Sequence, residues 1–322
     1  MSIPIVEVLN PGFLTTVQDR GRFHYQWRGI NRTGALDSFS YRIGNLLVGN
    51  SENAASLEMT ILGPSLRILQ DILIAVTGAD MSPAKNGNIL PMWTSVKVRQ
   101  GDVLSFSPLK EGCRGYLSVR NGISVPLLLG SCSTDLASKQ GGKEGRPLQT
   151  GDILESDPFK KGINFEANVF PPELIPRYNK NRTLRVILGP QTRYFEKELG
   201  IKTFLQSEYV ITPQASRQGY RLDGPSILQR QGIETSIPSE ATCPGGIQVP
   251  EEGKPIILLV ERLVGGYPKI ATVISSDLPL LAQLKPGDKI RFERVSLAKA
   301  HCILRKKEDT LQKWKDTLVK EK

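Results

Sequence analysis

Short apolar runs that stop at turn residues are the dominant pattern of this sequence. Apolar and polar residues alternate over Leu57–Leu62, and the run stops at Gly63-Pro64. A period of two is typical of a strand with one buried face. Ile72–Val76 and Ile256–Val260 are wholly apolar, which indicates strands buried on both faces, and Leu184–Leu188 again runs into a Gly-Pro pair. The pattern predicts a mainly β protein.

One segment carries a hairpin signal. Asn121-Gly122 separates the apolar runs Tyr116–Arg120 and Ile123–Leu129. A tight hairpin turn needs positive φ at both central positions, which Asn and Gly adopt most readily. We therefore predict a β-hairpin here and mostly antiparallel sheets.

Helical periodicity is confined to a few segments. Asp37 or Ser38 is placed to cap a helix whose apolar residues recur at helical spacing as far as Gly49-Asn50. A second helix is predicted over Thr192–Leu199 and is expected to stop at Gly200. Few helices are therefore expected among the strands.

Two further helices are predicted near the end of the chain. A short one runs from Ser276 or Asp277 to Leu284. From about Glu308 an apolar stripe recurs at helical spacing through Leu311, Trp314 and Leu318. The tail is therefore expected to be helical, and the pattern leaves open whether it docks or frays.

The chain is long enough for two domains, since it has 322 residues. The proline- and charge-rich stretch Asp157–Asn181 is the best candidate for a linker. We predict a first β-domain over residues 1–170, a second over 171–300, and a basic helical tail over 301–322.

The charge is basic but dispersed. The sequence has 42 Lys and Arg against 32 Asp and Glu, a formal net charge of +10. The basic residues are interleaved with acids, unlike the concentrated patches of nucleic-acid-binding proteins. We expect no nucleic-acid partner, and we interpret the charge as an ordinary basic surface or as suited to an anionic small molecule.

Scarce histidines and scattered cysteines exclude several kinds of site. The chain has two histidines, His24 and His301, and four isolated cysteines, Cys113, Cys132, Cys243 and Cys302. This set offers no zinc-binding spacing and no local signature of a Ser-His-Asp triad, so no metal is expected. No apolar run reaches the roughly 18 residues of a membrane helix, and the first residues lack a signal-type core. We expect a cytoplasmic protein without a membrane span.

Polar, glycine-containing loops follow several strands, where sites are often built. Thr15–Arg22 gathers an amide, a carboxylate and two guanidinium groups around Gly21, which suits a planar anionic or amide ligand. The alternative is a surface turn with an Asp19–arginine pair. In Gly34–Asp37, a plain helix-capping role for Asp37 is the favoured interpretation.

Two similar loops occur in the second half. Ser216–Pro225 brings two arginines, Tyr220 and Asp223 beside glycines, and the alternative is a surface hairpin rich in arginine. Glu261–Pro268 places an acid–base pair at the end of a buried strand, followed by Gly-Gly. The glycines would allow a ligand to approach the backbone, or they form an ordinary connection.

Several motifs, in order, resemble the family of the 5-oxoprolinase C-subunit, also known as biotin-dependent carboxyltransferase, the second component of allophanate hydrolase, or KipA. The similarity extends over about residues 5–295. The motifs that carry it are Pro11–Arg22, Gly34–Asp37, Asn45–Asn50, Thr77–Asp80, Gly130-Ser131, Ser133–Leu136, Gly219–Leu222, Gly246–Pro250 and Gly265–Ile274.

The resemblance implies a mainly β chain of two cyclophilin-like antiparallel β-barrel domains with a few short helices. It implies a hetero-oligomer with two partners, a KipI-like B-subunit together with an A-subunit. The implied reaction is the ATP-dependent opening of the lactam 5-oxoproline to glutamate, with ATP as cofactor of the complex. The implied alternatives are transfer of a carboxyl group from a biotin carrier to urea, and KipA-like, non-enzymatic binding of a kinase inhibitor.

The loops and the resemblance together select eight candidate residues. The candidates for a catalytic role are Asp19, Arg20, Asp37 and Arg217. The candidates for binding a small amide or lactam substrate are Gln18, Arg20, Tyr220, Arg221 and Tyr267.

The sequence departs from the family pattern at several loop positions. His24 stands where relatives usually have Gly, Cys132 where they have Arg, and Ser216 where they have Asp. Lys143 replaces an aromatic residue, and the loop before Gly265 is one residue short. These departures put the substrate in question more than the fold.

Overall fold

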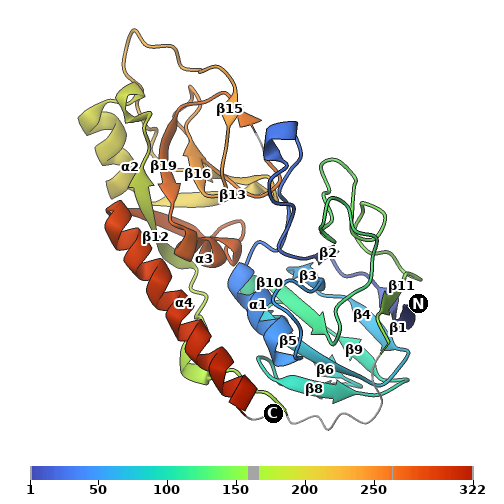
Figure 1. The fold of residues 1–322 in the computed structure, drawn as a ribbon. Coiled ribbons are helices and arrows are strands. Elements are labelled where there is room, and N and C mark those ends of the chain that lie inside the picture. Colours follow the sequence, from blue (N-terminus) through green and yellow to red (C-terminus); the bar gives the residue numbers. More distant parts are fainter. Residues whose placement is uncertain (1, 159–166, 263, 321–322) are drawn as a thin grey trace. The chain divides into compact units, whose positions relative to one another are not determined.

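The chain forms two compact units (Figure 1). The computed structural model describes residues 2–158, 167–262 and 264–320. The first unit comprises Met1–His24 and Arg32–Tyr178, and the second comprises Tyr25–Asn31 and Asn179–Lys322. Residues 159–166 of the proposed linker lie outside the described residues, and the division at residues 170 and 300 stays a prediction.

Two antiparallel sheets build the first unit. The six-stranded sheet has the order β11 (Ile153–Ser156), β1 (Ile3–Asn10), β4 (Ser65–Ile68), β9 (Val103–Ser105), β6 (Ala84–Lys85) and β7 (Asn88–Ile89). The five-stranded sheet has the order β2 (Leu14–Gln18), β3 (Ser56–Thr60), β10 (Glu111–Val119), β5 (Ile72–Asp80) and β8 (Ser95–Val98). Ile5 and Leu66 of the first sheet and Leu57 and Val76 of the second belong to one buried core.

A closed barrel forms the centre of the second unit. Its strands follow the order β12 (Asn181–Leu188), β19 (Lys269–Val273), β16 (Gly246–Gln248), β17 (Ile256–Leu258), β14 (Gly219–Asp223), β13 (Tyr209–Ala215) and β20 (Lys289–Arg294). Strands β12 and β20 are parallel, an exception among the mostly antiparallel pairs. Beside the barrel, β15 (Glu240–Ala241) pairs with β18 (Val264–Gly265).

The prediction of a mainly β protein with few helices is confirmed. The closed barrel lies in the second unit, whereas the strands of the first unit form two sheets. Alternating burial along a strand is the same in a sandwich and in a barrel, so the sequence pattern does not tell them apart.

Helix α1 (Ser38–Leu47) confirms both predicted ends. The Asp37 side chain accepts a hydrogen bond from Ser40 N at 3.0 Å and so caps the first turn. At the other end, Gly49 N donates to Leu46 O and Asn50 N to Asn45 O, the paired bonds of a Schellman motif. The helix packs on β5 and β10.

Two predicted elements differ from the structure. Ile123–Leu129 is a loop, not a strand, although Asn121 and Gly122 have the expected positive φ of 64° and 74°. After the turn, Ile123 N bonds Ala55 O instead of continuing a hairpin. Short helical turns replace the helix predicted over Thr192–Leu199, and they continue through the buried Gly200. The turns are η3 (Thr192–Tyr194), η4 (Lys197–Lys202) and α2 (Thr203–Gln206). Apolar residues three or four positions apart fit such turns as well as an α-helix, so the spacing did not distinguish the two.

The remaining short helices are single turns or little more. They are η1 (Gln26–Arg28), η2 (Pro172–Leu174), η5 (Ser275–Asp277) and α3 (Leu278–Ala282). The last two together account for the helix predicted from Ser276 or Asp277.

The C-terminal helix α4 (Leu297–Lys320) begins earlier than the predicted start near Glu308. Leu311 and Trp314 are buried, and Lys307 Nζ donates to Ser276 O at 2.6 Å. The tail is therefore docked on its own unit. Over the part of the chain that the structure describes, no helix is both long and apolar enough to cross a membrane.

Candidate active site

The Asp19 carboxylate joins two loops of the first unit. It accepts hydrogen bonds from Ser131 Oγ at 2.7 Å, Ser133 Oγ at 2.5 Å and Cys132 N at 2.6 Å, and also from Gly21 N at 2.7 Å. Asp19 is only 7% exposed, so these donors replace water around its charge. Its two oxygens together accept four hydrogen bonds, so the carboxylate holds the two loops together.

Arg22 and Gln18 extend this network. The Arg22 side chain is 1% exposed and donates to Leu128 O, Thr33 Oγ1 and Ser133 O. Gln18 is fully buried, and its Nε2 donates to Thr16 Oγ1 and Thr134 O, each at 3.1 Å. Gln18 Oε1 has no hydrogen-bond partner among the described residues.

A cavity of about 470 Å³ opens beside the Asp19 network, and we call it the arginine cavity. Arg20 is exposed at this cavity, and its Nη1 donates to Asn53 Oδ1 at 3.1 Å. The cavity is lined by Asp19, Arg20, Gly21, Phe23, Asn53, Ala54, Ala55, Asn121, Ile123, Ser124, Val125, Leu127, Gly130, Cys132 and Asp157. A guanidinium, two amides and an apolar wall suit a small polar molecule with an anionic group.

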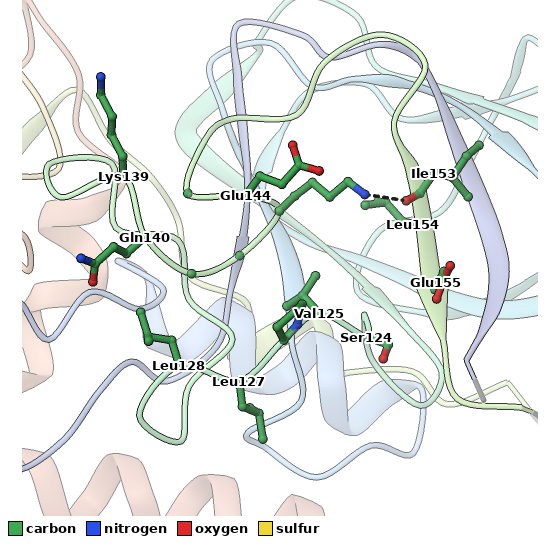
Figure 2. Close-up of a pocket in the computed structure, with 15 residues that line it drawn as sticks. Ser124, Val125, Leu127, Leu128, Lys139, Gln140, Glu144, Ile153, Leu154 and Glu155 are labelled. Atoms are coloured by element: carbon green, nitrogen blue, oxygen red, sulfur yellow. Dashed lines mark hydrogen bonds between the residues drawn. The ribbon is translucent and has the colours of Figure 1, made fainter.

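A second hollow of about 710 Å³, the loop cavity, shares Ser124, Val125 and Leu127 with the arginine cavity. Figure 2 shows it between the segment around Glu144 and the strand that carries Ile153. Lys143 Nζ donates to Ile153 O at 3.4 Å. The loop that replaces the expected strand at Ile123–Leu129 thus separates two cavities.

Asp37 lies in a different, buried part of the same unit. Its carboxylate accepts from Ser40 N and from Ser40 Oγ, the latter at 2.6 Å, and Ser40 Oγ lies 3.1 Å from Tyr178 Oη. Burial raises the pKa of Tyr178 well above its usual value, and the charge of Asp37 adds to the effect. The helix-capping interpretation of Asp37 accounts for these contacts.

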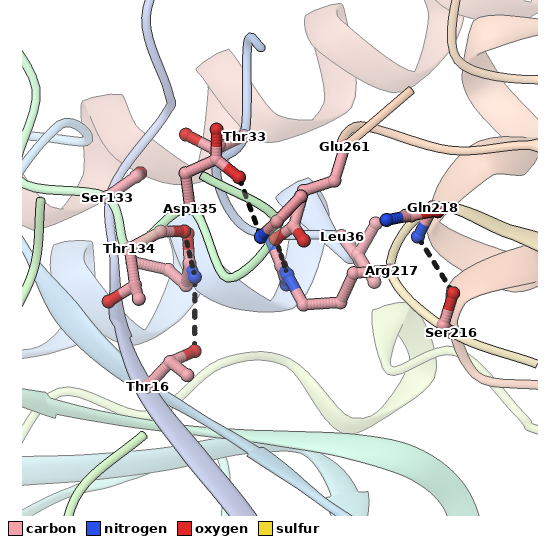
Figure 3. Close-up of polar contacts among 12 residues, drawn as sticks. Thr16, Thr33, Leu36, Ser133, Thr134, Asp135, Ser216, Arg217, Gln218 and Glu261 are labelled. Carbon is pink, nitrogen blue, oxygen red and sulfur yellow. Dashed lines mark hydrogen bonds and ion pairs between the residues drawn. The ribbon is translucent and has the colours of Figure 1, made fainter. Parts of the chain in front are cut away.

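Arg217, a candidate catalytic residue in the second unit, forms a buried ion pair with Glu261. Its Nε lies 2.5 Å from Glu261 Oε1, and the two side chains are 4% and 2% exposed. Figure 3 shows Arg217 beside Glu261, and Ser216 beside Gln218. Ser216 Oγ accepts from Gln218 N at 3.2 Å, so the residue in the family's Asp position closes a local turn.

The structure separates the other three candidates of this unit. Tyr220 is 1% exposed in the core, and its hydroxyl donates to Leu284 O, whereas Arg221 is exposed. Neighbouring residues of a strand point to opposite faces, so Tyr220 and Arg221 do not share a site on β14. Tyr267 is 39% exposed, and Leu263 of its loop lies outside the described residues.

Two departures from the family pattern have visible consequences. His24 has a φ of 69°, a conformation that favours glycine, the residue expected there. Cys132 lines the arginine cavity, and burial together with the charge of Asp19 raises the pKa of its thiol to about 11. The thiol is therefore protonated at neutral pH.

Arg32 is a residue of this region that the sequence did not single out. Its guanidinium carbon lies 4.4 Å from the centroid of the Phe23 ring, and that of Arg20 lies 5.8 Å from the same centroid. The available signal was a basic residue just before Gly34–Asp37. Arg32 lies near Arg20 because the chain turns back on itself between them, with Arg22 N donating to Arg32 O. The sequence alone does not show this proximity.

Comparison with known proteins identifies the family. A family model described as carboxyltransferase domain, subdomain A and B, matches residues 28–294. The chain belongs to the carboxyltransferase domain family. This confirms the resemblance found in the sequence.

The carboxyltransferase-domain chain is similar over most of its length to several characterised proteins. It is 36% identical over 305 residues to the 5-oxoprolinase C-subunit of Haemophilus influenzae, covering 94% of this chain and 96% of that protein. It is 36% identical to the 5-oxoprolinase C-subunit of Escherichia coli, with 92% and 93% covered. Urea amidolyase of Saccharomyces cerevisiae is 32% identical over 92% of this chain, which corresponds to 17% of that enzyme.

Solved structures give the same result for this carboxyltransferase-domain chain. The K. lactis urea amidolyase matches with a TM-score of 0.89 and 32% identity, covering 98% of this chain and 20% of the enzyme. TTHA0988 matches with a TM-score of 0.80 and 35% identity, covering 90% of this chain and 55% of that one. The homologues are therefore parts of enzyme complexes or of larger enzymes.

Proposed function

We propose that this chain is the C-subunit of an ATP-dependent 5-oxoprolinase, which converts 5-oxo-L-proline to L-glutamate in a complex of this chain with an A-subunit plus a KipI-like B-subunit. The observation that carries the proposal is the similarity over nearly the whole length of two bacterial components of that enzyme. The urea enzymes, by contrast, contain the matching region as a small part of a much longer chain.

The arginine cavity supports this choice of substrate class. Arg20 is exposed there beside the amides of Asn53 and Asn121, and Ile123 and Val125 provide an apolar wall. A guanidinium pairs with carboxylates, and amides pair with the N–H and C=O groups of a lactam. The cavity thus offers partners for each part of 5-oxoproline.

The chemistry requires activation, because a lactam amide resists direct attack by water. The lactam oxygen attacks the γ-phosphorus of ATP and ADP leaves. Water then adds to the activated carbon, the ring C–N bond breaks, and the nitrogen takes up a proton as the amine of glutamate. A second water releases the phosphate. The role we assign to Arg20 is to hold the substrate and to stabilise negative charge at the reacting group.

Turnover in the assembled complex tests the proposal. This chain is co-expressed with the A- and B-subunits, and glutamate formation is measured with and without ATP. We expect activity only with ATP, 5-oxoproline and all three proteins. Arg20→Ala is expected to lower kcat/KM by about 100-fold or more, equivalent to about 2.7 kcal/mol. The control is Arg67→Ala, since Arg67 is a surface arginine of the same unit whose side chain forms an ion pair with Glu7 at 2.9 Å.

A second function is favoured by one specific observation, the match of urea amidolyase to 98% of this chain. A biotin-dependent carboxyltransferase would use no lactam and would act on urea only with a biotinylated carrier protein. Urea carboxylation in the absence of 5-oxoproline turnover would replace our proposal with this one. Tight partner binding without turnover of lactam or urea would instead favour the KipA-like regulator.

A further inference from the structure

Arg20 and Arg32 are held close together by the backbone of the first unit. A Cβ added to Gly21 would lie 2.5 Å from Arg32 O, and one added to Gly34 would lie 2.7 Å from Arg20 O. Both glycines have a φ of +92°. The two chain segments therefore run in direct contact, and Arg22 N bonds Arg32 O at 2.6 Å. This contact brings both arginines to the ring of Phe23.

Neither arginine has a carboxylate partner among the described residues. The hydrogen-bond partner of Arg20 is the neutral amide of Asn53. The backbone carbonyl of Arg32 accepts hydrogen bonds, but its buried guanidinium Nε has no hydrogen-bond partner in the described part of the chain. Of the acids that line the cavity, Asp19 already accepts four hydrogen bonds and Asp157 is exposed.

The arrangement is costly without a ligand. Burial lowers the pKa of Arg32, and the nearby charge of Arg20 lowers it further. A desolvated cation beside a like charge is normally neutralised by an acid. Arg146 of the same unit illustrates the ordinary solution, since it holds both oxygens of Asp152 at 2.8 and 2.9 Å.

We propose that Arg20, Arg32 and Phe23 form an anion-binding site at the edge of the arginine cavity, which takes the carboxylate or phosphate of a small molecule. Arg20 and Phe23 line the cavity, and Arg32 adjoins it through its contact with the Phe23 ring. The two guanidinium groups supply the positive charge, and both lie within cation–π distance of the Phe23 ring, with guanidinium carbons 5.8 and 4.4 Å from its centroid. Under the proposed function, on which this identification rests, the anion is the carboxylate of 5-oxoproline.

Binding to the purified full-length chain tests the site independently of turnover. Three probes are titrated by calorimetry: 5-oxoproline, its uncharged analogue 2-pyrrolidinone, and inorganic phosphate. We expect 5-oxoproline to bind at least about tenfold more tightly than 2-pyrrolidinone. Arg32→Met should weaken 5-oxoproline binding by about tenfold or more and leave 2-pyrrolidinone unchanged. Arg32→Lys should restore part of the loss because it keeps the charge.

The controls and outcomes separate the site from the function. Arg67→Met, at a surface arginine, should bind every probe as the wild type does. Phosphate binding that depends on Arg32, without 5-oxoproline binding, would keep the anion site and remove the proposed substrate. Equal binding of both anions by wild type and Arg32→Met, or no binding of either, would overturn the site. Arg32→Gln provides a second test if Arg32→Met does not fold.

Discussion

Two arginine-containing loops of this protein use the same side chain in opposite ways. In the second unit, Arg217 is buried against the carboxylate of Glu261 at 2.5 Å. In the first unit, Arg20 and Arg32 share the Phe23 ring and have no carboxylate partner among the described residues. Each loop contains, or lies next to, a motif by which the sequence resembles the carboxyltransferase domain family.

The difference between the loops is one of charge balance. A buried ion pair leaves its arginine little capacity for a ligand, and breaking it exposes the cost of an unpaired buried charge. Two neighbouring arginines without a carboxylate partner repel each other and are partly desolvated. A bound anion would offset this electrostatic cost. We therefore assign ligand binding to the first loop and a structural role to the second.

The largest expected effect is at the buried pair. Glu261→Gln removes the negative charge that lies 2.5 Å from Arg217 Nε and should lower the free energy of unfolding by about 3–5 kcal/mol. The measurement is urea-induced unfolding, compared with Glu251→Gln at an exposed site, for which a change below about 0.5 kcal/mol is expected. A decrease in the free energy of unfolding of less than about 1 kcal/mol would contradict a structural role for the Arg217–Glu261 pair.

The next effect concerns the carboxylate that shapes the arginine cavity. Asp19→Asn replaces one accepting oxygen by a donor and opposes the donors from Ser131, Cys132 and Ser133. We expect a loss of about 2–4 kcal/mol, together with faster amide hydrogen exchange in residues 130–133. If amide hydrogens of residues 130–133 exchanged at the same rate in the variant as in the wild type, the positioning role of Asp19 would be contradicted.

A paired arginine of the first unit provides a smaller, pH-dependent effect. Hydrogen bonds from Arg146 hold the pKa of Asp152 below its ordinary value, so the pair stabilises the fold above the pKa of the unfolded state, near 4. Asp152→Asn should cost about 1 kcal/mol at pH 7, because the pair is partly exposed. The difference in melting temperature from wild type should shrink as the pH falls from 5 to 3. A difference that does not change with pH would contradict this assignment.

The smallest effect has the opposite sign. Arg32→Met removes a desolvated cation beside Arg20 and should raise the free energy of unfolding by about 0.5 kcal/mol without ligand, despite the lost stacking on Phe23. Salt screens the repulsion, so the gain should decrease as salt is added. Destabilisation by about 1 kcal/mol or more would mean that Arg32 is a structural residue like Arg217.

The sequence was most informative where local rules act alone. Asp37 and Gly49 marked both ends of α1, because capping depends on only a few neighbouring residues. The turn at Asn121-Gly122 was also predicted correctly in its backbone conformation. The strand predicted after this turn is absent. Ile123 N donates to Ala55 O instead of pairing with the strand that precedes the turn.

The candidate residues show where local pattern stops being sufficient. Tyr220 and Arg221 are adjacent in a family motif, yet the pleat of β14 sends one into the core and the other to solvent. Asp19 was a candidate for catalysis, and only the folded loops reveal that its oxygens are already occupied. Arg32 was missed because its importance comes from a neighbour in space.

By itself the sequence determined the family, the mainly β architecture and the loop that carries Asp19 and Arg20, since these follow from the order of motifs and from periodic burial. Tertiary structure alone decided which charges are neutralised. Glu261 reaches Arg217 across 44 residues of sequence, and chain closure at Gly21 and Gly34 brings Arg32 to Arg20. Electrostatic interactions depend on distance and burial in the folded protein, and neither is encoded in the spacing of residues along the chain.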